Sequence, residues 1–489
     1  MEHLQVLLVV VPLLAAPVCA LLPGRRMPWL FAMVVAWAAF AMAVVLALQV
    51  RASGVLSYAL GGWAAPWGIE YRLDAANALV QLLVAAIAAV VLPFAGRSVA
   101  REIDRARQGG FYAALLLLIA GLLGITATGD AFNVFVFLEI SSLSTYTLIA
   151  MGRDRRALTA AFRYLIMGTI GATFYLIGVG LLYAMTGTLN MADLAERLPA
   201  VADTRTVHTA VAFIVAGLCL KIALFPLHLW LPNAYAYAPS AVTALMAATS
   251  TKVAVYVLIR FVYTILGADF AFGELSLASV LLGLAVLGML TASAVAVTQP
   301  DAKRMLAYSS VAQVGYMVLG LSLASVTGLT AALLHMMNHA VMKSALFMAL
   351  GCVAYRLGGT AVADLRGLGR SMPWTMAAFV GGGLSLIGVP LTVGFISKWY
   401  LVLAALEQGR WILVAAVVAS SLLAVAYIWR IVEVAYFQAP ARTDVKEAPW
   451  SLLAPTWILV LANFWLGIDT RATVGLAGQA ARALLGAGP

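Results

Sequence analysis

The sequence predicts an all-α polytopic membrane protein with about fourteen transmembrane helices. Hydrophobic residues occupy 64% of its 489 positions and charged residues only 10%, whereas soluble domains carry about 25% charged residues. The apolar residues also gather in runs of about 20, the length that crosses a bilayer. No stretch is polar enough to form a separate soluble domain that would carry out catalysis or bind nucleic acid.

Fourteen apolar segments are long enough to be considered as membrane spans. They lie near residues 4–22, 28–50, 75–95, 111–129, 131–150, 158–185, 209–227, 242–265, 276–298, 302–323, 326–356, 374–402, 411–433 and 451–468. The first is interpreted as a membrane helix and not as a signal peptide, because no Lys or Arg precedes it. The loop 53–74 is rich in Gly, Trp and Pro and ends in an alternating pattern, which predicts a small outer hairpin.

Basic residues of short loops stay on the cytoplasmic side of a membrane. One alternate set of loops contains Arg25, Arg26, Arg97, Arg101, Arg105, Arg107, Arg153, Arg155, Arg156, Lys303, Arg304, Arg356, Arg366, Arg370, Arg442 and Lys446. The other set contains only Arg51, Arg72, Arg197, Arg205 and Arg410. This bias predicts a multi-pass protein of the cell inner (cytoplasmic) membrane with both termini on the outer side.

The three cysteines, Cys19, Cys219 and Cys352, lie in apolar runs and form no CxxC pair. They are therefore not expected to form disulfides or to bind an iron–sulfur cluster or zinc. No cofactor motif, metal-ligand set or nucleophile constellation is apparent, so an enzyme acting by itself is not predicted. A structural membrane scaffold would explain the helices but not the charged residues inside them.

Five charged residues fall well inside apolar segments: Glu139, Lys221, Lys252, Lys343 and Lys398. A charge near the bilayer centre costs about 2.5–3.5 kcal/mol even on the lenient insertion scale, so each should be paired, cavity-facing or functional. A static ion pair is the structural alternative, but four lysines cannot all pair with one carboxylate. A buried lysine without a full partner can release its proton, which is the property that a proton carrier needs.

His335, His339 and Lys343 are spaced four residues apart, which places three titratable groups on one helix face. Polar contacts between helices are the structural alternative. A zinc site is not favoured, because no carboxylate or cysteine lies nearby in the sequence.

Prolines interrupt two of the charged segments, at Pro226 after Lys221 and at Pro390 before Lys398. Discontinuous helices with an ionisable group in each half of a chain indicate an ion site in transporters built from inverted repeats. Lys221 and Lys398 are therefore interpreted as equivalent positions of two halves.

Three ordered segments resemble the antiporter-like subunit family of respiratory complex I, membrane-bound hydrogenases and Mrp-type cation/proton antiporters. They are Phe225-Pro226-Leu227-His228-Leu229-Trp230-Leu231-Pro232-Asn233-Ala234-Tyr235, Thr251-Lys252-Val253-Ala254-Val255-Tyr256 and Asp301-Ala302-Lys303-Arg304-Met305-Leu306-Ala307-Tyr308-Ser309-Ser310. The resemblance implies two inverted five-helix repeats, helices 4–8 and 9–13, with broken helices 7 and 12. Residues 1–110 would then hold helices 1–3, 111–265 the first repeat, 266–433 the second repeat, and 434–489 the last helix and a short tail.

The resemblance also implies that Glu139 pairs with Lys221 and that Lys252 and the helix 11 face continue a polar axis to Lys398. Asn233 and Lys398 resemble the D subunit of Mrp antiporters, whereas His335 and His339 look more like complex I subunits. The function expected is that of a proton-translocating subunit of a multisubunit Na⁺/H⁺ antiporter, corresponding to its D subunit. The alternative is an antiporter-like subunit of a complex I or hydrogenase-type assembly. Either assembly implies other membrane subunits, H⁺ and lipid as partners, and the antiporter adds Na⁺.

Overall fold

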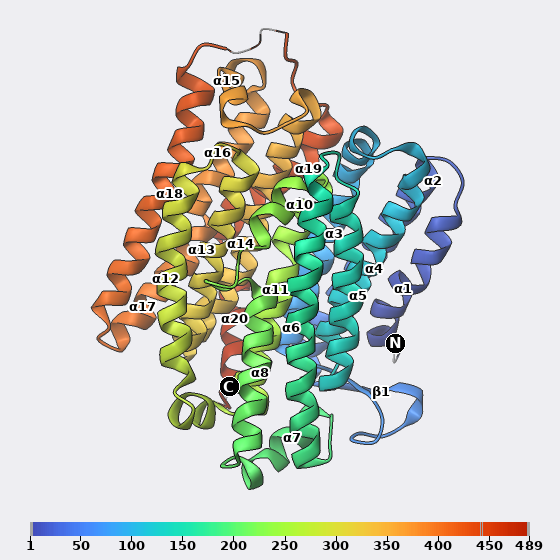
Figure 1. Ribbon diagram of the computed structural model, residues 1–489, viewed down its shortest axis with the longest axis vertical. Helices are drawn as coiled ribbons and strands as arrows, with labels where there is room; N and C mark the ends of the chain where they lie inside the picture. The colour runs from blue at the N-terminus through green and yellow to red at the C-terminus, as the bar shows by residue number, and fades with distance from the viewer. Residues whose placement is uncertain (1–2, 441, 443, 487–489) are drawn as a thin grey trace.

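The computed structural model describes residues 3–440, 442 and 444–486. Its helices form one bundle, and the only regular strands among these residues belong to a two-stranded hairpin (Figure 1). Thirteen described helices are long and apolar enough to cross a membrane. The predicted span 374–402 is present as two shorter helices in succession. The predicted class, an all-α polytopic membrane protein with about fourteen spans, is confirmed.

The first part of the chain contains three spanning helices and the hairpin. Its elements are α1 (Leu4–Leu21), α2 (Arg26–Ser53), β1 (Leu56–Ala59), β2 (Glu70–Leu73) and α3 (Ala75–Glu102). The strands pair antiparallel with Leu56 opposite Leu73, so the hairpin expected in loop 53–74 is present. The carboxylate of Asp74 accepts hydrogen bonds from the backbone N–H groups of Ala76 and Asn77, which fixes the start of α3.

The next elements are α4 (Gln108–Ala127), α5 (Ala131–Ala150), α6 (Arg156–Thr186), α7 (Met191–Arg197), α8 (Arg205–Ile222), α9 (Leu231–Tyr237), α10 (Ser240–Ala248), α11 (Ser250–Ile259) and the π-helical η4 (Arg260–Ile265). They are followed by α12 (Leu277–Thr298), α13 (Ala302–Ser322), α14 (Val326–Leu357), α15 (Leu368–Ser371), α16 (Pro373–Ile387), α17 (Val393–Glu407), α18 (Trp411–Phe437), α19 (Trp450–Ile468) and α20 (Arg471–Leu484). The hairpin and α7 lie at the lower end of Figure 1, α15 lies at the upper end, and the start of α1 and the end of α20 lie in the lower half.

Three interruptions divide spanning helices. The two that the prolines predict separate α8 from α9 and α16 from α17. The third, which was not predicted, separates α10 from α11 at Thr249, where φ is −122° and ψ is −55°. No glycine or proline marks this position, and the mean hydropathy of the segment is that of an uninterrupted span.

The predicted short tail contains a further helix, α20, which packs against α14 and α3. Its buried residues include Thr473, Ala477, Ala480 and Ala481, which form one narrow face. The sequence-based expectation overlooked this helix because it is short and moderately polar. The last three residues of the predicted tail, 487–489, lie outside the described residues.

The centre of the bundle consists of α3, α4, α10, α11, α13 and α14, in which most residues are buried. In contrast, fewer than half of the residues of α2, α6, α12 and α18 are buried. Helix α14 contacts α3, α10, α13, α16, α17, α19 and α20, so its polar face is enclosed on all sides. The division into inverted repeats at 111–265 and 266–433 stays a prediction.

Candidate functional site

The glutamate and the first lysine form an ion pair inside the bundle. Glu139 Oε1 on α5 lies 3.5 Å from Lys221 Nζ on α8. The ammonium group also donates a hydrogen bond of 2.7 Å to Ser142 Oγ, three residues further along α5. Only 4% of the Lys221 side chain is exposed, compared with 24% of the Glu139 side chain. The carboxylate therefore retains some access to the surface, and the ammonium group has almost none.

Lys221 lies in the last turn of α8, where unpaired carbonyl groups form the negative end of the helix dipole. The helix ends because Ala223 takes a left-handed conformation with φ of 60°. Trp230 Nε1 donates a hydrogen bond of 3.0 Å to the Leu220 carbonyl, which also accepts one of 3.2 Å from the backbone N–H of Ala223. The interrupted helix thus provides a polar site for a cation within an apolar bundle.

Lys252 lies just after the unpredicted interruption, in the first turn of α11. Its ammonium group donates hydrogen bonds to the Ala247 carbonyl, at the end of α10, and to Thr251 Oγ1 at 3.3 Å. The side chain is fully buried. None of the described carboxylates forms an ion pair with it. Lys252 therefore depends on neutral oxygen atoms for its hydrogen bonds.

The polar face of α14 begins with His335 and His339, which are both fully buried. His335 Nε2 lies 2.8 Å from Gln313 Oε1, and its Nδ1 lies 2.9 Å from Ser397 Oγ. Because the amide oxygen only accepts, Nε2 is the donor and Nδ1 accepts from the serine hydroxyl. The two imidazole rings are parallel, with centroids 6.0 Å apart. Neither ring nitrogen of His339 has a hydrogen-bond partner among the described residues.

Lys343 continues the same face one turn beyond His339. Its ammonium group donates to the Leu306 carbonyl at 2.8 Å and to the hydroxyl of Ser309, both on α13. Like Lys252, it is fully buried and pairs with no carboxylate in the described part of the chain.

Lys398 lies on α17, after the interruption, whereas Lys221 lies before the interruption of its own helix. Its side chain reaches back to the Leu386 and Ile387 carbonyls at 3.0 and 2.8 Å, which α16 leaves free at its end. Ser421 Oγ accepts a third hydrogen bond at 3.0 Å. The interpretation of the two lysines as equivalent positions of two halves stays a prediction. What they share is a place at the carbonyl end of the preceding half-helix.

These groups lie close enough to influence one another. His339 lies within electrostatic range of Lys252 and Lys343, and His335 lies within range of Lys252 and Lys398. The residues Lys252, His339, His335, Lys343 and Lys398 therefore form one connected set, which we call the buried axis.

Lys221 borders a small cavity of about 20 Å³. Lys221, Ser142 and Ser250 belong to its wall. This volume suffices for one water molecule. Ser250 Oγ is buried and has no hydrogen-bond partner among the described residues. A water in this cavity can bridge Lys221 to Ser250, two residues before Lys252.

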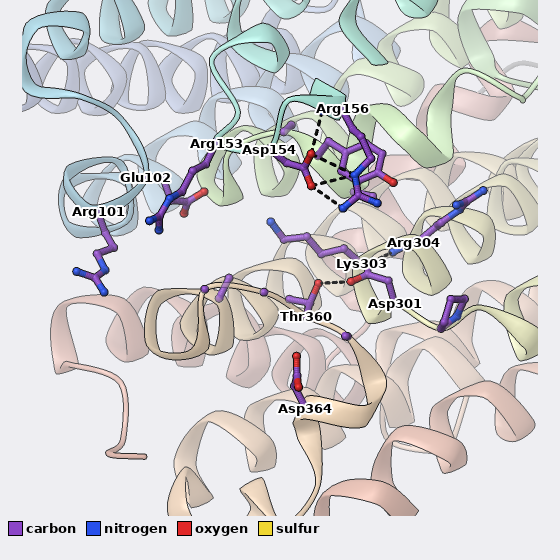
Figure 2. A pocket seen from close by; sticks show the side chains of 18 residues that line it. Arg101, Glu102, Arg153, Asp154, Arg156, Asp301, Lys303, Arg304, Thr360 and Asp364 are labelled. Carbon is purple, nitrogen blue, oxygen red and sulfur yellow. Dashed lines mark hydrogen bonds and ion pairs between the residues drawn. The ribbon is translucent and has the colours of Figure 1, made fainter. Parts of the chain in front are cut away.

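A larger cavity of about 460 Å³ lies where several basic loops meet (Figure 2). Arg101, Arg153 and Arg304 approach it from segments that are far apart in the sequence. The structure thus brings together loops that the basic-residue pattern assigned to one side of the membrane.

The side chain of Lys303 is buried in the wall of this cavity, although the sequence placed it in a solvated loop. Its ammonium group donates a hydrogen bond of 3.0 Å to Ser240 Oγ. Glu102 accepts a hydrogen bond of 2.8 Å from the Ser240 backbone, at the start of α10. On the cavity rim, hydrogen bonds from Arg156 hold the pKa of Asp154 below its ordinary value.

Arg260 is a buried charged residue that was not singled out from the sequence, although it lies inside a predicted span. It lies near the end of segment 242–265, and its side chain is only 9% exposed. A search for every charge within the span limits would have found it. Ser142, Gln313 and Ser397 were missed for a different reason, because single uncharged polar residues are common in membrane helices.

The family described as NADH:quinone oxidoreductase/Mrp antiporter, transmembrane, matches residues 128–424. The N subunit of the NADH-quinone oxidoreductase of Desulforudis audaxviator is 46% identical over 95% of this chain and 96% of its own length. The D subunit of the Na(+)/H(+) antiporter of Alkalihalophilus pseudofirmus is 32% identical over 87% of this chain and 85% of its own. A chain of the Mrp complex from Dietzia sp. is 28% identical with a TM-score of 0.91, over 99% of this chain and 97% of that chain.

Proposed function

Because this chain belongs to the transmembrane family shared by NADH:quinone oxidoreductases and Mrp antiporters, we propose that it is a proton-translocating subunit of a larger membrane assembly. The observation that carries the proposal is the buried axis together with the Glu139–Lys221 pair. Four lysines and two histidines line up inside an apolar bundle with a single carboxylate among them. Burying such groups destabilises a protein, so proton transfer explains their presence in the bundle better than a contribution to stability does.

The ion pair gates the path in this proposal. While Glu139 and Lys221 are in contact, the carboxylate favours the charged ammonium group. When the two separate, the ammonium group loses its counter-ion and passes a proton through the small cavity toward Lys252. The proton then moves along the polar face of α14, through Lys343, His339 and His335, to Lys398, which lies within electrostatic range of His335.

The experiment that tests this function compares proton movement by the parental assembly and by a Lys252→Met variant in sealed membrane vesicles. Methionine keeps the length of the side chain and removes the proton-bearing group. The variant should assemble and lose transport. Parental transport by an assembled Lys252→Met variant would refute the proposed path.

Two assemblies fit the family. An Na⁺/H⁺ antiporter in which this chain is the D subunit is supported by the 32% identical antiporter chain and the TM-score of 0.91 to a Mrp complex chain. A redox-driven assembly of the complex I type is supported by the 46% identical oxidoreductase chain. Both imply other membrane subunits as partners and a place in the cell inner membrane. The basic residues of the loops favour termini on the outer side.

Purification from native membranes separates these candidates. Co-purified antiporter subunits and Na⁺-dependent acidification changes in vesicles would identify the first assembly. Quinone-oxidoreductase subunits and proton movement driven by quinone reduction would identify the second. In either case the isolated chain in liposomes should produce little Na⁺-dependent pH change, and robust exchange by it would refute the need for partners.

A further inference from the structure

The helix face that carries Lys252 continues toward the hairpin end of the molecule. Tyr256 and Arg260 follow Lys252 at spacings of four residues, so the three side chains share one face. Each step along this face covers about 6 Å. Lys252 is part of the buried axis, whereas Tyr256 and Arg260 have no place in the path described above.

Arg260 connects this face to the start of α3. Its Nε donates a hydrogen bond of 3.0 Å to Tyr256 Oη, and its Nη2 donates to the carboxylate of Asp74 and to the amide oxygen of Asn77. Asn77 Nδ2 donates a further hydrogen bond of 2.7 Å to Tyr256 Oη. The hydroxyl oxygen of Tyr256 thus accepts two hydrogen bonds. We call Asp74, Asn77, Tyr256 and Arg260 the Arg260 cluster.

A cavity of about 700 Å³ borders this cluster at the hairpin end, and all four cluster residues belong to its wall. Asp74 also borders a second cavity of about 440 Å³ between α2, α3 and α20. The cluster therefore lies between these cavities and the segment of α11 that carries Lys252. The other charged residues around the two cavities are Arg51, Arg72, Asp269 and Arg482.

We propose that the Arg260 cluster is a gate for protons between Lys252 and the cavity at the hairpin end. In this gate Asp74 takes up the proton, Tyr256 relays it, and Arg260 is the positioning residue that keeps the gate closed. The inference rests on the proposed function, because it extends the same proton path.

Arg260 closes the gate by acting on two groups, the carboxylate of Asp74 and the hydroxyl oxygen of Tyr256. Burial raises the pKa of Asp74. The charge of Arg260, its hydrogen bond to the carboxylate and two hydrogen bonds from backbone N–H groups lower it, and together they outweigh burial, so the pKa lies below its ordinary value. The carboxylate is then a poor proton acceptor. Arg260 Nε and Asn77 Nδ2 together also occupy both lone pairs of Tyr256 Oη. A displacement of the guanidinium group frees the acceptor and the relay at the same time.

The transfer conserves protons and charge. Once the guanidinium group has moved, the Lys252 ammonium group gives one proton to Tyr256 Oη and becomes a neutral amine. The hydroxyl group passes its original proton to the Asp74 carboxylate, which becomes a carboxylic acid and then releases the proton to water in the cavity. Lys252 now donates to the Ala247 carbonyl, so its side chain must turn toward Tyr256 for this step.

The alternative is a purely structural role, in which the Asp74–Arg260 ion pair only holds the start of α3 against the end of α11. The variant Asp74→Asn distinguishes the two roles, because asparagine still caps α3 and accepts from Arg260 but takes up no proton. Tyr256→Phe keeps the ring and removes only the hydroxyl group. Asp269→Asn is the matched control, since Asp269 borders the same cavity, is exposed, and lies outside the cluster.

The experiment uses the complete assembly in sealed vesicles and measures two quantities, driven proton transport and the passive decay of an imposed pH gradient. Asp74→Asn and Tyr256→Phe should each reduce driven transport by about 100-fold, the usual contribution of a positioned proton-transfer group. Arg260→Gln should speed the passive decay, because the closing charge is lost. Asp269→Asn should change neither quantity. If Asp74→Asn does not assemble, Tyr256→Phe and Arg260→Gln decide.

Lys252→Met is measured in parallel to separate the gate from the proposed function. Parental transport by Asp74→Asn or Tyr256→Phe, with transport lost in Lys252→Met, would overturn the gate and leave the buried axis intact. Unchanged passive decay in Arg260→Gln would overturn the closing role of Arg260. Parental transport by Lys252→Met would instead refute the proposed function itself.

Discussion

Lys221→Arg separates a proton carrier from a fixed counter-ion, because both roles need the positive charge and only the first needs proton release. The guanidinium group keeps the charge that faces Glu139. At the 3.5 Å separation of this pair, Coulomb's law with an effective dielectric constant of about 20 gives about 5 kcal/mol of attraction. The arginine variant should therefore retain the pair and assemble at the parental level.

Proton release is the property that the arginine variant loses. Arginine has a pKa above about 12, so deprotonation at about pH 7 costs about 7 kcal/mol, equivalent to about 10⁵-fold in the population of the neutral form. Transport through Lys221 should fall below detection. Lys221→Ala should also lose transport, and its assembled amount should fall, because it leaves Glu139 unpaired at a cost of about 3–5 kcal/mol.

The assay measures assembled protein by gel filtration and proton flux in sealed vesicles, expressed per assembled complex. Lys446→Arg serves as the matched control, since Lys446 is an exposed loop lysine and should tolerate the change. If Lys221→Arg transports at the parental rate while Lys221→Ala does not, Lys221 is a fixed counter-ion. The proton path would then have to avoid it.

Three further predictions concern other parts of the chain. His339→Phe should assemble normally, because it removes two buried nitrogens without partners among the described residues, but should reduce proton flux by about 100-fold; parental flux would show that His339 only fills space. Gly394→Ala should sharply lower the yield of folded protein in a detergent stability assay, because the new Cβ would lie 1.7 Å from the Ser385 carbonyl oxygen. Gly180→Ala, with no atom within 4 Å of its Cβ, should not. Cysteines at positions 105 and 155 should react with impermeant thiol reagents only from the cytoplasmic side, and labelling of both from outside would invert the predicted topology.

The sequence by itself determined the class of protein and the positions of its spans, because membrane insertion depends on the local hydropathy of about 20 consecutive residues. The same local property singled out Glu139, Lys221, Lys252, Lys343 and Lys398 as costly charges. The spacing of His335 and His339 and the two proline interruptions were also visible, since they depend only on neighbouring residues.

The tertiary structure alone decided which groups meet. Asp74 and Arg260 are 186 residues apart in the sequence, and Lys221 and Ser142 are 79 apart, so no local pattern predicts these contacts. The interruption at Thr249 was hidden because hydropathy averages over a whole segment and no proline marks the site. Lys398 shows the same limit: its sequence position lies after an interruption, and only packing shows that its ammonium group returns to the carbonyls before it. Hydrogen-bond partners in a helix bundle are set by which faces pack together, and hydropathy carries no information about that choice.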